Sequence, residues 1–279
     1  MSTKPVVAGT DGSEESLRAV EWAAREALLR GAALRIVSAA ESLAGMHQRR
    51  DGTGVNTVTD VLIEQRNRAL ATAAQRAAAV APGLIIDTDE LHGGIAEAVA
   101  DSGSGAGLLV VGSRGIGAFA AMILGSVSRF AATHATCPVA VVRSDSAQAR
   151  GQIGVGIRDA ETCTDALAFA FEEASLRKAG LTVVYARHGQ VPPGNGAADG
   201  AEEALTSLLA SWRDKYPSVQ VTQDLADGHP GHVLSELSAH TDLVVIGRRP
   251  AGAGGRGPGK VRNALLHHAQ GVVVTVPSA

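Results

Sequence analysis

The chain contains two copies of one strand–helix–strand pattern, and this repeat limits its possible folds more than any other feature. Residues 6–39 read "VVAGTDGSEESLRAVEWAAREALLRGAALRIVSA", and residues 153–186 read "IGVGIRDAETCTDALAFAFEEASLRKAGLTVVYA". Each copy shows a short apolar strand, a polar turn, an amphipathic helix, a glycine stop near Gly31 or Gly180, and a second apolar strand. Two later segments also match, "AGLLVVGSRG" (106–115) with "TDLVVIGRRP" (241–250) and "CPVAVV" (137–142) with "GVVVTV" (271–276). The repeat predicts two domains of one architecture.

The two copies differ in length mainly in the polar stretch after the second strand, residues 41–60 in the first copy and 187–200 in the second. Length differences of this kind are typical of surface loops. The polar segment "RSDSAQARG" at 143–151 has no apolar periodicity and separates the copies. We therefore predict a first domain over residues 1–147 and a second domain over residues 148–279.

Strands and helices alternate within each copy. In the first copy we expect strands near 4–9, 33–39, 84–90, 107–111 and 138–142, and helices near 14–30, 59–80, 93–102 and 126–134. Short, apolar, β-branched strands separated by helices are typical of a parallel sheet that is covered on both faces. Right-handed crossovers then make each copy doubly wound. The expected fold class is α/β, with two tandem doubly wound domains, each a mainly parallel five-stranded sheet with helices on both faces.

Composition excludes several classes of function. The formal net charge of -3 and the aromatic content of 3% disfavour a surface for nucleic acid. The N-terminal segment "MSTKPVVAGTDG" lacks the apolar region of a secretory signal, and no apolar run approaches the ~20 residues of a membrane helix. Cys137 and Cys163 show no metal-ligand spacing and are expected to be buried thiols. We expect a cytoplasmic protein that binds neither nucleic acid nor a membrane.

A glycine-rich loop follows the fourth expected strand, in "VGSRGIGAFAAMILGSVSRF" at 111–130. Ligands of doubly wound folds bind beyond the carboxyl ends of the strands. Glycines there present backbone N–H groups, and the helix that starts near Ser126 adds more N–H groups and a partial positive charge. The pattern indicates an anion site for phosphates, although it matches neither a Walker A loop nor the Rossmann fingerprint. The alternative is a flexible connection without a ligand.

Asp11 follows the first strand in "VVAGTDGS". If the first and fourth strands are neighbours, Asp11 and the glycine loop share one crevice. A carboxylate in that place suits a ribose hydroxyl or an adenine amine, away from the phosphates. The alternative is a turn or N-cap aspartate before the helix near 14–30, and the two roles are compatible.

The spacing Gly112-x2-Gly115-x9-Gly125-Ser126, with "VVAGTDGS" at the start and "TCPVAVV" at the end, resembles the universal stress protein family over nearly the whole chain. In ATP-binding members of that family, the spaced-glycine loop holds the phosphates and ribose. The resemblance implies that the phosphate and ribose side is formed by Gly112, Arg114, Gly115, Gly125, Ser126, Val127 and Ser128. It also implies that Thr10 and Asp11 line the base and ribose, and that the Ala39 backbone contacts adenine. A solvated surface position is the alternative for Arg114.

The second copy lacks this pattern in "GRRPAGAGGRGPGKVRNALLHHA" at 247–269. Pro250, which has no N–H group, takes the place of the second glycine. Lys260 replaces Ser126, and Arg158 stands where Asp11 stands in the first copy. The segment gains cations, namely Arg248, Arg249, Arg256, Lys260 and Arg262. Two interpretations stay open: a degenerate solvated site, or a site for another anion or an altered nucleotide.

No nucleophile–base pair stands out, and the histidines show no metal spacing, so we assign no catalytic residue and no metal ligand. We predict an ATP-binding regulatory module of the stress response that has an unidentified protein partner, with the presence of Mg²⁺ left open. The alternatives are a slow ATPase or phosphotransferase, and an interaction scaffold that no longer binds nucleotide. From the resemblance we also expect pairing through the last strands, "PVAVV" (138–142) and "VVVTV" (272–276), within the chain and in a homodimer.

Overall fold

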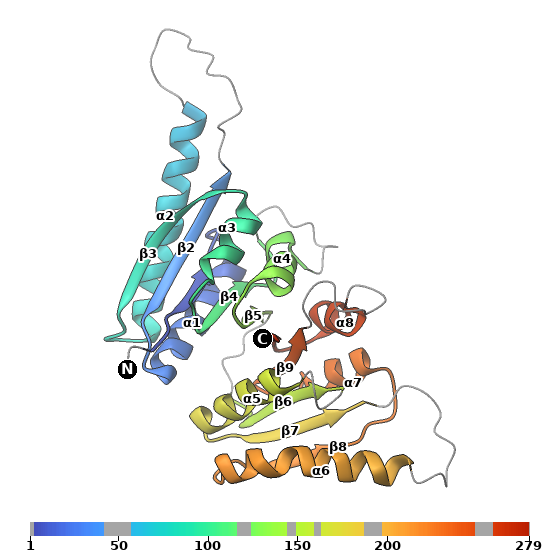
Figure 1. Ribbon diagram of the computed structural model, residues 1–279. Coiled ribbons are helices and arrows are strands. Elements are labelled where there is room, and N and C mark those ends of the chain that lie inside the picture. The colour runs from blue at the N-terminus through green and yellow to red at the C-terminus, as the bar shows by residue number, and fades with distance from the viewer. Residues whose placement is uncertain are drawn as a thin grey trace. The chain divides into compact units, whose positions relative to one another are not determined.

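The computed structural model describes residues 3–41, 57–115, 124–143, 149–158, 163–186, 197–248 and 259–278. The chain divides into two compact units, Met1–Arg143 and Ser144–Ala279. Each unit contains one sheet with its own helices (Figure 1). The predicted boundary between residues 147 and 148 lies outside the described residues, and it stays a prediction.

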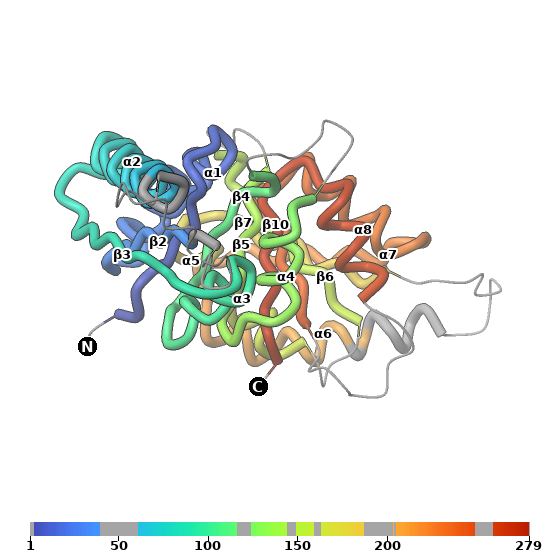
Figure 2. The backbone as a smooth tube through the Cα atoms, turned by 90° about the horizontal axis from the view of Figure 1, so that it is seen from above, coloured from blue at the N-terminus to red at the C-terminus, as the bar shows by residue number. Residues whose placement is uncertain are grey.

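Unit one is a doubly wound α/β domain. Its elements are β1 (Val6–Gly9), α1 (Glu14–Arg30), β2 (Leu34–Glu41), α2 (Thr57–Val80), β3 (Ile86–Gly93), α3 (Ile95–Ser102), β4 (Leu108–Gly112), α4 (Ser126–His134) and β5 (Val139–Val142). The strand order is β3-β2-β1-β4-β5, and the strands are parallel. Helices α1 and α2 pack together on one side of this sheet, and α3 and α4 pack together on the other (Figure 2).

Unit two repeats this architecture. Its elements are β6 (Gln152–Ile157), α5 (Thr164–Arg177), β7 (Gly180–Tyr185), α6 (Ala197–Lys215), β8 (Val221–Asp224), α7 (Pro230–Leu237), β9 (Leu243–Arg248), α8 (Lys260–His268) and β10 (Val272–Pro277). The strand order β8-β7-β6-β9-β10 is that of unit one, with the strands again parallel. The predicted fold class is therefore confirmed: two tandem doubly wound domains with mainly parallel sheets.

The core of each unit lies between its sheet and its helices. Leu108 and Leu109 of β4 have no solvent exposure, and neither have the alanines of α1 that face the sheet: Ala19, Ala23, Ala24 and Ala27. Alanine side chains let the α1 backbone approach the strands closely, because each places only a methyl group between helix and sheet. Burial of apolar surface at roughly 25 cal/mol per Å² is the main stabilising contribution to such a core.

Both units bury a glutamate–arginine pair near the end of their first helix. In unit one the Glu26 side chain is almost inaccessible to solvent, and its Oε1 lies 2.5 Å from Nε of Arg30. In unit two the fully buried Glu173 pairs with Arg177. The pair corresponds to "EALLR" and "EASLR" in the two copies of the repeat. Losing one member of a buried pair is costly, so this contact contributes to the repeated fold and not to a ligand site.

The first helix of each unit ends in a left-handed residue, but only unit one uses glycine there. Gly31 has φ 61° and its N–H donates to the carbonyls that end α1. In unit two the equivalent residue is Lys178, with φ 53°. Gly180, expected as the stop from the sequence, instead begins β7. The expectation at Gly180 is wrong because the helix ends two residues earlier, at a residue type that rarely adopts this conformation.

Lys178→Gly should therefore stabilise the protein. Glycine adopts the left-handed conformation without the Cβ strain of lysine, so we expect a gain of about 1 kcal/mol in the free energy of unfolding. Urea unfolding of parent and variant measures the change. Lys178→Ala is the matched control, because alanine removes the charged side chain but retains the Cβ atom. An equal gain in both variants would show that the backbone strain is not the cause.

Candidate functional site

A tight turn connects β1 to α1 at the carboxyl edge of unit one. The Thr10 N–H donates to the Val37 carbonyl of β2 over 2.9 Å, which continues the sheet one residue past β1. Gly12, with φ 82°, lets the chain reverse, and its N–H donates to Thr10 Oγ1 over 3.1 Å. The Thr10 and Ser16 hydroxyls lie 3.0 Å apart. This network fixes the direction in which Asp11 leaves the turn.

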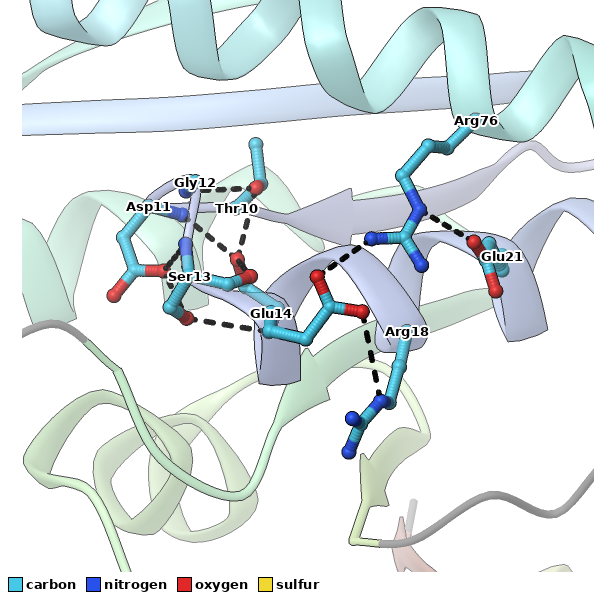
Figure 3. Close-up of polar contacts among 9 residues, drawn as sticks. Thr10, Asp11, Gly12, Ser13, Glu14, Arg18, Glu21 and Arg76 are labelled. Atoms are coloured by element: carbon cyan, nitrogen blue, oxygen red, sulfur yellow. Dashed lines mark hydrogen bonds and ion pairs between the residues drawn. The ribbon is translucent and has the colours of Figure 1, made fainter.

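Asp11 uses one carboxylate oxygen within this turn. Its Oδ1 accepts hydrogen bonds from the Ser13 N–H, over 2.9 Å, and from the Ser13 hydroxyl, over 2.6 Å (Figure 3). Ser13 itself is the N-cap of α1 and accepts from the Ser16 N–H. The alternative of a turn aspartate is thus confirmed, while the N-cap is Ser13. The sequence analysis missed Ser13 and Ser16, although S-x-x-S before an apolar helix is a recognisable capping pattern.

The other oxygen of Asp11 faces the glycine loop. A Cβ atom placed on Gly115 would clash with Asp11 Oδ2. The structure therefore brings Asp11 and Gly115 together, as expected for neighbouring strands β1 and β4. The carboxylate is held by its Ser13 contacts, so it has little freedom to move aside for a side chain at position 115. Residues 116–123 of the loop lie outside the described part of the chain.

Gly112 has a packing role that does not depend on a ligand. It is the last residue of β4 and pairs with Val142 of β5. A Cβ atom at this position would lie 3.0 Å from the Glu15 carbonyl oxygen and 3.2 Å from Ser16 Cα. Both contacts are with the backbone of α1, which has no room to shift against the sheet. The first glycine of the motif is therefore required where the first turn of α1 crosses the end of β4.

Gly125 differs from Gly112, because the surrounding structure does not require glycine there. It is the N-cap of α4, with an ordinary extended backbone of φ -72° and ψ 155°. Its N–H donates to the Ser113 carbonyl over 2.8 Å. A Cβ atom would make only ordinary contacts, 3.4 Å from Ser128 Oγ and 3.5 Å from the Ser113 oxygen. Packing within the described residues thus leaves the third motif glycine, Gly125, unexplained.

The first turn of α4 presents its backbone more than its side chains. The buried Ser128 hydroxyl donates to the Gly112 carbonyl over 2.6 Å, so this side chain ties the helix to the end of β4. Ser126 is exposed and Val127 is half-buried. No acidic residue lies in this turn, and the N–H groups that open a helix have no intrahelical acceptor. The turn is suited to an anion.

The two other predicted site residues lie at the same edge. Arg114 is exposed and lies two residues after the end of β4. Ala39 lies within β2, paired with Leu91 of β3, because β2 runs two residues further than predicted. Since β1 ends opposite Val37, Ala39 lies beyond the end of β1. The predicted site residues thus extend along the carboxyl edge from β2 across β1 to β4.

An arginine that the sequence analysis did not single out, Arg143, follows β5 at this edge. Burial lowers the pKa of its guanidinium, and the positive charge of Arg114 lowers that pKa further. The edge of β4 and β5 is thus electropositive. In the sequence, Arg143 is one arginine after the last strand of the first copy. Nothing in the sequence alone shows that it lies beside Arg114 of the glycine loop.

An ion-pair network anchors the N-terminal part of α1 to α2 (Figure 3). Arg76 of α2 contacts Glu14 over 2.8 Å and Glu21 over 2.5 Å. The Arg76 hydrogen bond is the main cause that holds the pKa of Glu14 below its ordinary value, and it also raises the pKa of Arg76. Glu14 directly follows the Ser13 cap, so this network supports the turn that positions Asp11.

Unit two retains the backbone positions of this crevice but not its residues. Gly247 pairs with Val276 as Gly112 pairs with Val142. Gly259 is the N-cap of α8 and Lys260 its first residue, which confirms the expected equivalence with Gly125 and Ser126. Arg158 follows β6 and is exposed. Pro250, Arg249 and Arg256 lie outside the described residues. Burial lowers the pKa of Arg262.

The part of the chain that the structure describes contains no group of three or more histidine, cysteine or acidic residues suited to a metal ion. Cys137 and Cys163 are buried thiols, as predicted, and neither forms a disulfide. Within the described residues, no helix has the length and apolarity needed to cross a membrane.

Fold and crevice together define a tandem doubly wound α/β protein in which one unit presents backbone N–H groups at its carboxyl edge. The family model for the universal stress protein family matches residues 2–143 and 150–277. The chain therefore belongs to the universal stress protein family, with two family domains in tandem.

Individual relatives agree over the full length. A universal stress protein of Mycobacterium tuberculosis, Rv1996, is 31% identical over 296 residues, covering 96% of this chain and 93% of the relative. A universal stress protein of Mycolicibacterium smegmatis is 31% identical over 259 residues, covering 88% and 87%. The crystal structure of a universal stress protein from Archaeoglobus fulgidus, 15% identical, matches with a TM-score of 0.77 and covers 100% of both chains. That structure supports the fold.

Arg76→Met should make stability less dependent on pH between neutral and acidic solution. Because Arg76 lowers the pKa of Glu14 in the folded state, its contribution is present above the ordinary Glu pKa and is lost as pH falls through the folded value. We expect the variant to be less stable than the parent at pH 7, and the difference to shrink as the pH falls below the ordinary Glu pKa and through the lowered folded-state pKa of Glu14. Urea unfolding at several pH values measures this, with the exposed Arg25→Met on α1 as control. A constant difference across pH would contradict the assignment.

Proposed function

We propose that unit one binds ATP in the crevice between the β1–α1 turn and the N-terminus of α4, and that occupancy regulates a partner in a stress response. The observation that carries this proposal is the position of Asp11, with one oxygen held in the turn and the other against Gly115. A fixed carboxylate beside a glycine loop and an open helix N-terminus suits a ligand that has hydroxyls at one point and phosphates at another.

The proposed placement follows the order of the strands. Thr10 and the Ala39 backbone would line the base, and Asp11 would accept a hydrogen bond from a ribose hydroxyl. The phosphates would lie at Gly112, Gly115 and Arg114, with the N–H groups of Ser126, Val127 and Ser128 as further donors. β2, β1 and β4 are consecutive in the sheet, so the site spans two strand spacings, roughly 10 Å.

The same geometry favours binding without rapid turnover. Ser128 donates its hydroxyl hydrogen to a backbone carbonyl, which leaves it poorly suited to attack a phosphate. Ser13 contacts the Asp11 carboxylate, a contact that would favour the alternative of a phosphotransferase, but its oxygen also caps α1. We therefore assign no catalytic residue. Measuring ADP release from the purified protein separates a binding module from a slow ATPase, and absence of binding indicates a scaffold.

Further parts of the proposal concern the assembly of the protein. We propose a cytoplasmic homodimer with contacts near the last strands, β5 and β10, and a regulatory protein that recognises the nucleotide-bound form. Light scattering with and without ATP measures the molecular mass of the protein in solution, and this tests the proposed homodimer. Extraction and identification of any nucleotide that copurifies with the chain tests the ligand itself.

Gly125→Ala should abolish ATP binding while leaving the fold intact. The fold has room for the methyl group, so we expect the free energy of unfolding to change by less than about 1 kcal/mol. ATP at one hundred times Kd should raise the stability of the parent by about 2.7 kcal/mol and leave the variant unchanged. Thermal melting with and without ATP measures both effects.

Gly112→Ala is the matched comparison for that variant. Its methyl group meets the α1 backbone, so we expect a loss of about 1–3 kcal/mol in stability without any ligand. If Gly125→Ala binds ATP as tightly as the parent, the α4 N-terminus is not the phosphate site.

Titration of the whole chain should give about one ATP per chain. Arg158 and Lys260 replace Asp11 and Ser126 in unit two, so the base and phosphate ends both change. The added cations retain attraction for anions but supply no acceptor for a ribose hydroxyl. Isothermal titration calorimetry measures the stoichiometry, and Asp11→Asn, which retains the Oδ1 acceptor for Ser13, is expected to weaken the single site. Two equal sites would contradict the asymmetry of the units.

A further inference from the structure

Arg143 lies immediately beyond the strand pair that carries the glycine loop. Gly112 of β4 pairs with Val142 of β5, and the Ser113 N–H donates to the Val142 carbonyl over 2.9 Å. The segments that follow β4 and β5 therefore still run side by side as they leave the sheet. Arg114 and Arg143 each follow that last hydrogen bond by one residue, so the backbone places both arginines at the same edge.

The direction of the Arg143 side chain follows from strand geometry. Successive side chains of a strand point to opposite faces of the sheet. The Gly112 and Val142 positions share the face on which Gly112 meets α1. Alternation therefore predicts that Arg143 leaves toward the other face. That is the face where α4 packs against β4 and β5 and where Ser128 bonds to the Gly112 carbonyl.

Arg114, Arg143 and the N-terminus of α4 thus lie at one edge of the sheet. The effect of Arg114 on the pKa of Arg143 shows that the two charges are close enough to repel each other. The first turn of α4 carries no acidic residue to offset them. A polyphosphate carries several negative charges in a short length, and it suits a region where two arginines lie near the N–H groups that open a helix.

We infer that Arg143 is a phosphate-binding residue of the nucleotide site, and that with Arg114 it makes the site selective for a nucleoside triphosphate over a monophosphate. The inference rests on the proposed function and adds the residue that sets the preference for phosphate number. Arginine suits this role because its planar fork donates two parallel hydrogen bonds to phosphate oxygens.

Unit two supplies an internal comparison. Its register places Pro277 opposite Arg248, one position after the pair of Val276 with Gly247. Pro277 is therefore the equivalent of Arg143, and proline has neither a charge nor an N–H group. The arginine after the last strand is present in the unit that has Asp11 and Ser126, and absent from the unit that has Arg158 and Lys260. The arginine thus varies together with the nucleotide signature and not with the fold.

The test is titration of the full chain with ATP and with AMP, in buffer without divalent cations. We expect Arg143→Gln to weaken ATP binding by about 10- to 100-fold, the loss of one charge-assisted hydrogen bond, and AMP binding by less than about threefold. Arg143→Lys should fall between parent and Arg143→Gln, because it retains the charge without the fork. Arg68→Gln, an exposed position on α2 with the same change in net charge, is the control and should bind as the parent does.

The outcomes separate this inference from the proposed function. Suppose that the parent binds ATP. If Arg143→Gln then weakens the affinities for ATP and AMP by the same factor, or changes neither affinity, the inference is overturned and nucleotide binding stands. A parent that binds neither nucleotide overturns both. The unliganded melting temperature checks the fold of each variant. If Arg143→Gln does not fold, Arg143→Lys and the parent decide: the parent must bind ATP at least about tenfold more tightly than AMP at low salt, and equal affinities overturn the inference.

Discussion

The crevice of unit one depends on the close approach of α1 to the end of β4. The Glu15 carbonyl and Ser16 Cα lie so near Gly112 that a Cβ atom there would be crowded by the backbone of the helix. This approach brings the turn at Thr10–Ser13 alongside the loop that leaves β4, and it places the Asp11 carboxylate against Gly115. The hydroxyls of Ser13 and Ser16 then hold the turn in place. A helix one side chain further from the sheet would separate the carboxylate from the loop.

Most of the fold could be predicted because parallel strands buried on both faces are written as continuous apolar runs. "LLVVG" and "VAVV" are fully buried, and their ends differ from the expected ranges by one residue at most. The edge strand β3, "IDTDELHG", is mostly exposed and polar, so its sequence does not reveal where pairing stops. Strand β2 runs to Glu41 because β3 continues to pair with it past the end of β1. Such boundaries depend on a partner strand and are invisible in the strand's own residues.

The site could be predicted in outline but not in the role of each residue. The sequence places Asp11 and the glycine loop at one edge, since adjacent parallel strands end there. It does not distinguish a glycine required by packing, Gly112, from one that packing leaves unexplained, Gly125, because the difference lies in contacts with distant residues. Ser128 was assigned to the phosphate side, yet its hydroxyl bonds to a strand carbonyl. The sequence does not single out Arg143, because its significance comes from Arg114 in the loop that follows the neighbouring strand β4.

The two units together show which residues serve the fold and which serve the crevice. Strand order, the buried pairs at Glu26 and Glu173, and the glycine that caps the helix after the loop occur in both. Several residues that differ in kind lie at the carboxyl edge, at positions that follow β1, begin α4 and follow β5. At the opposite edge the helix cap changes from Gly31 to Lys178, while the buried glutamate–arginine pair beside it is retained. Under the proposed function, these changes at the carboxyl edge would alter what each unit binds. Within the described residues, unit one combines the Asp11 carboxylate held in its turn with Arg114 and Arg143 at the edge of β4 and β5.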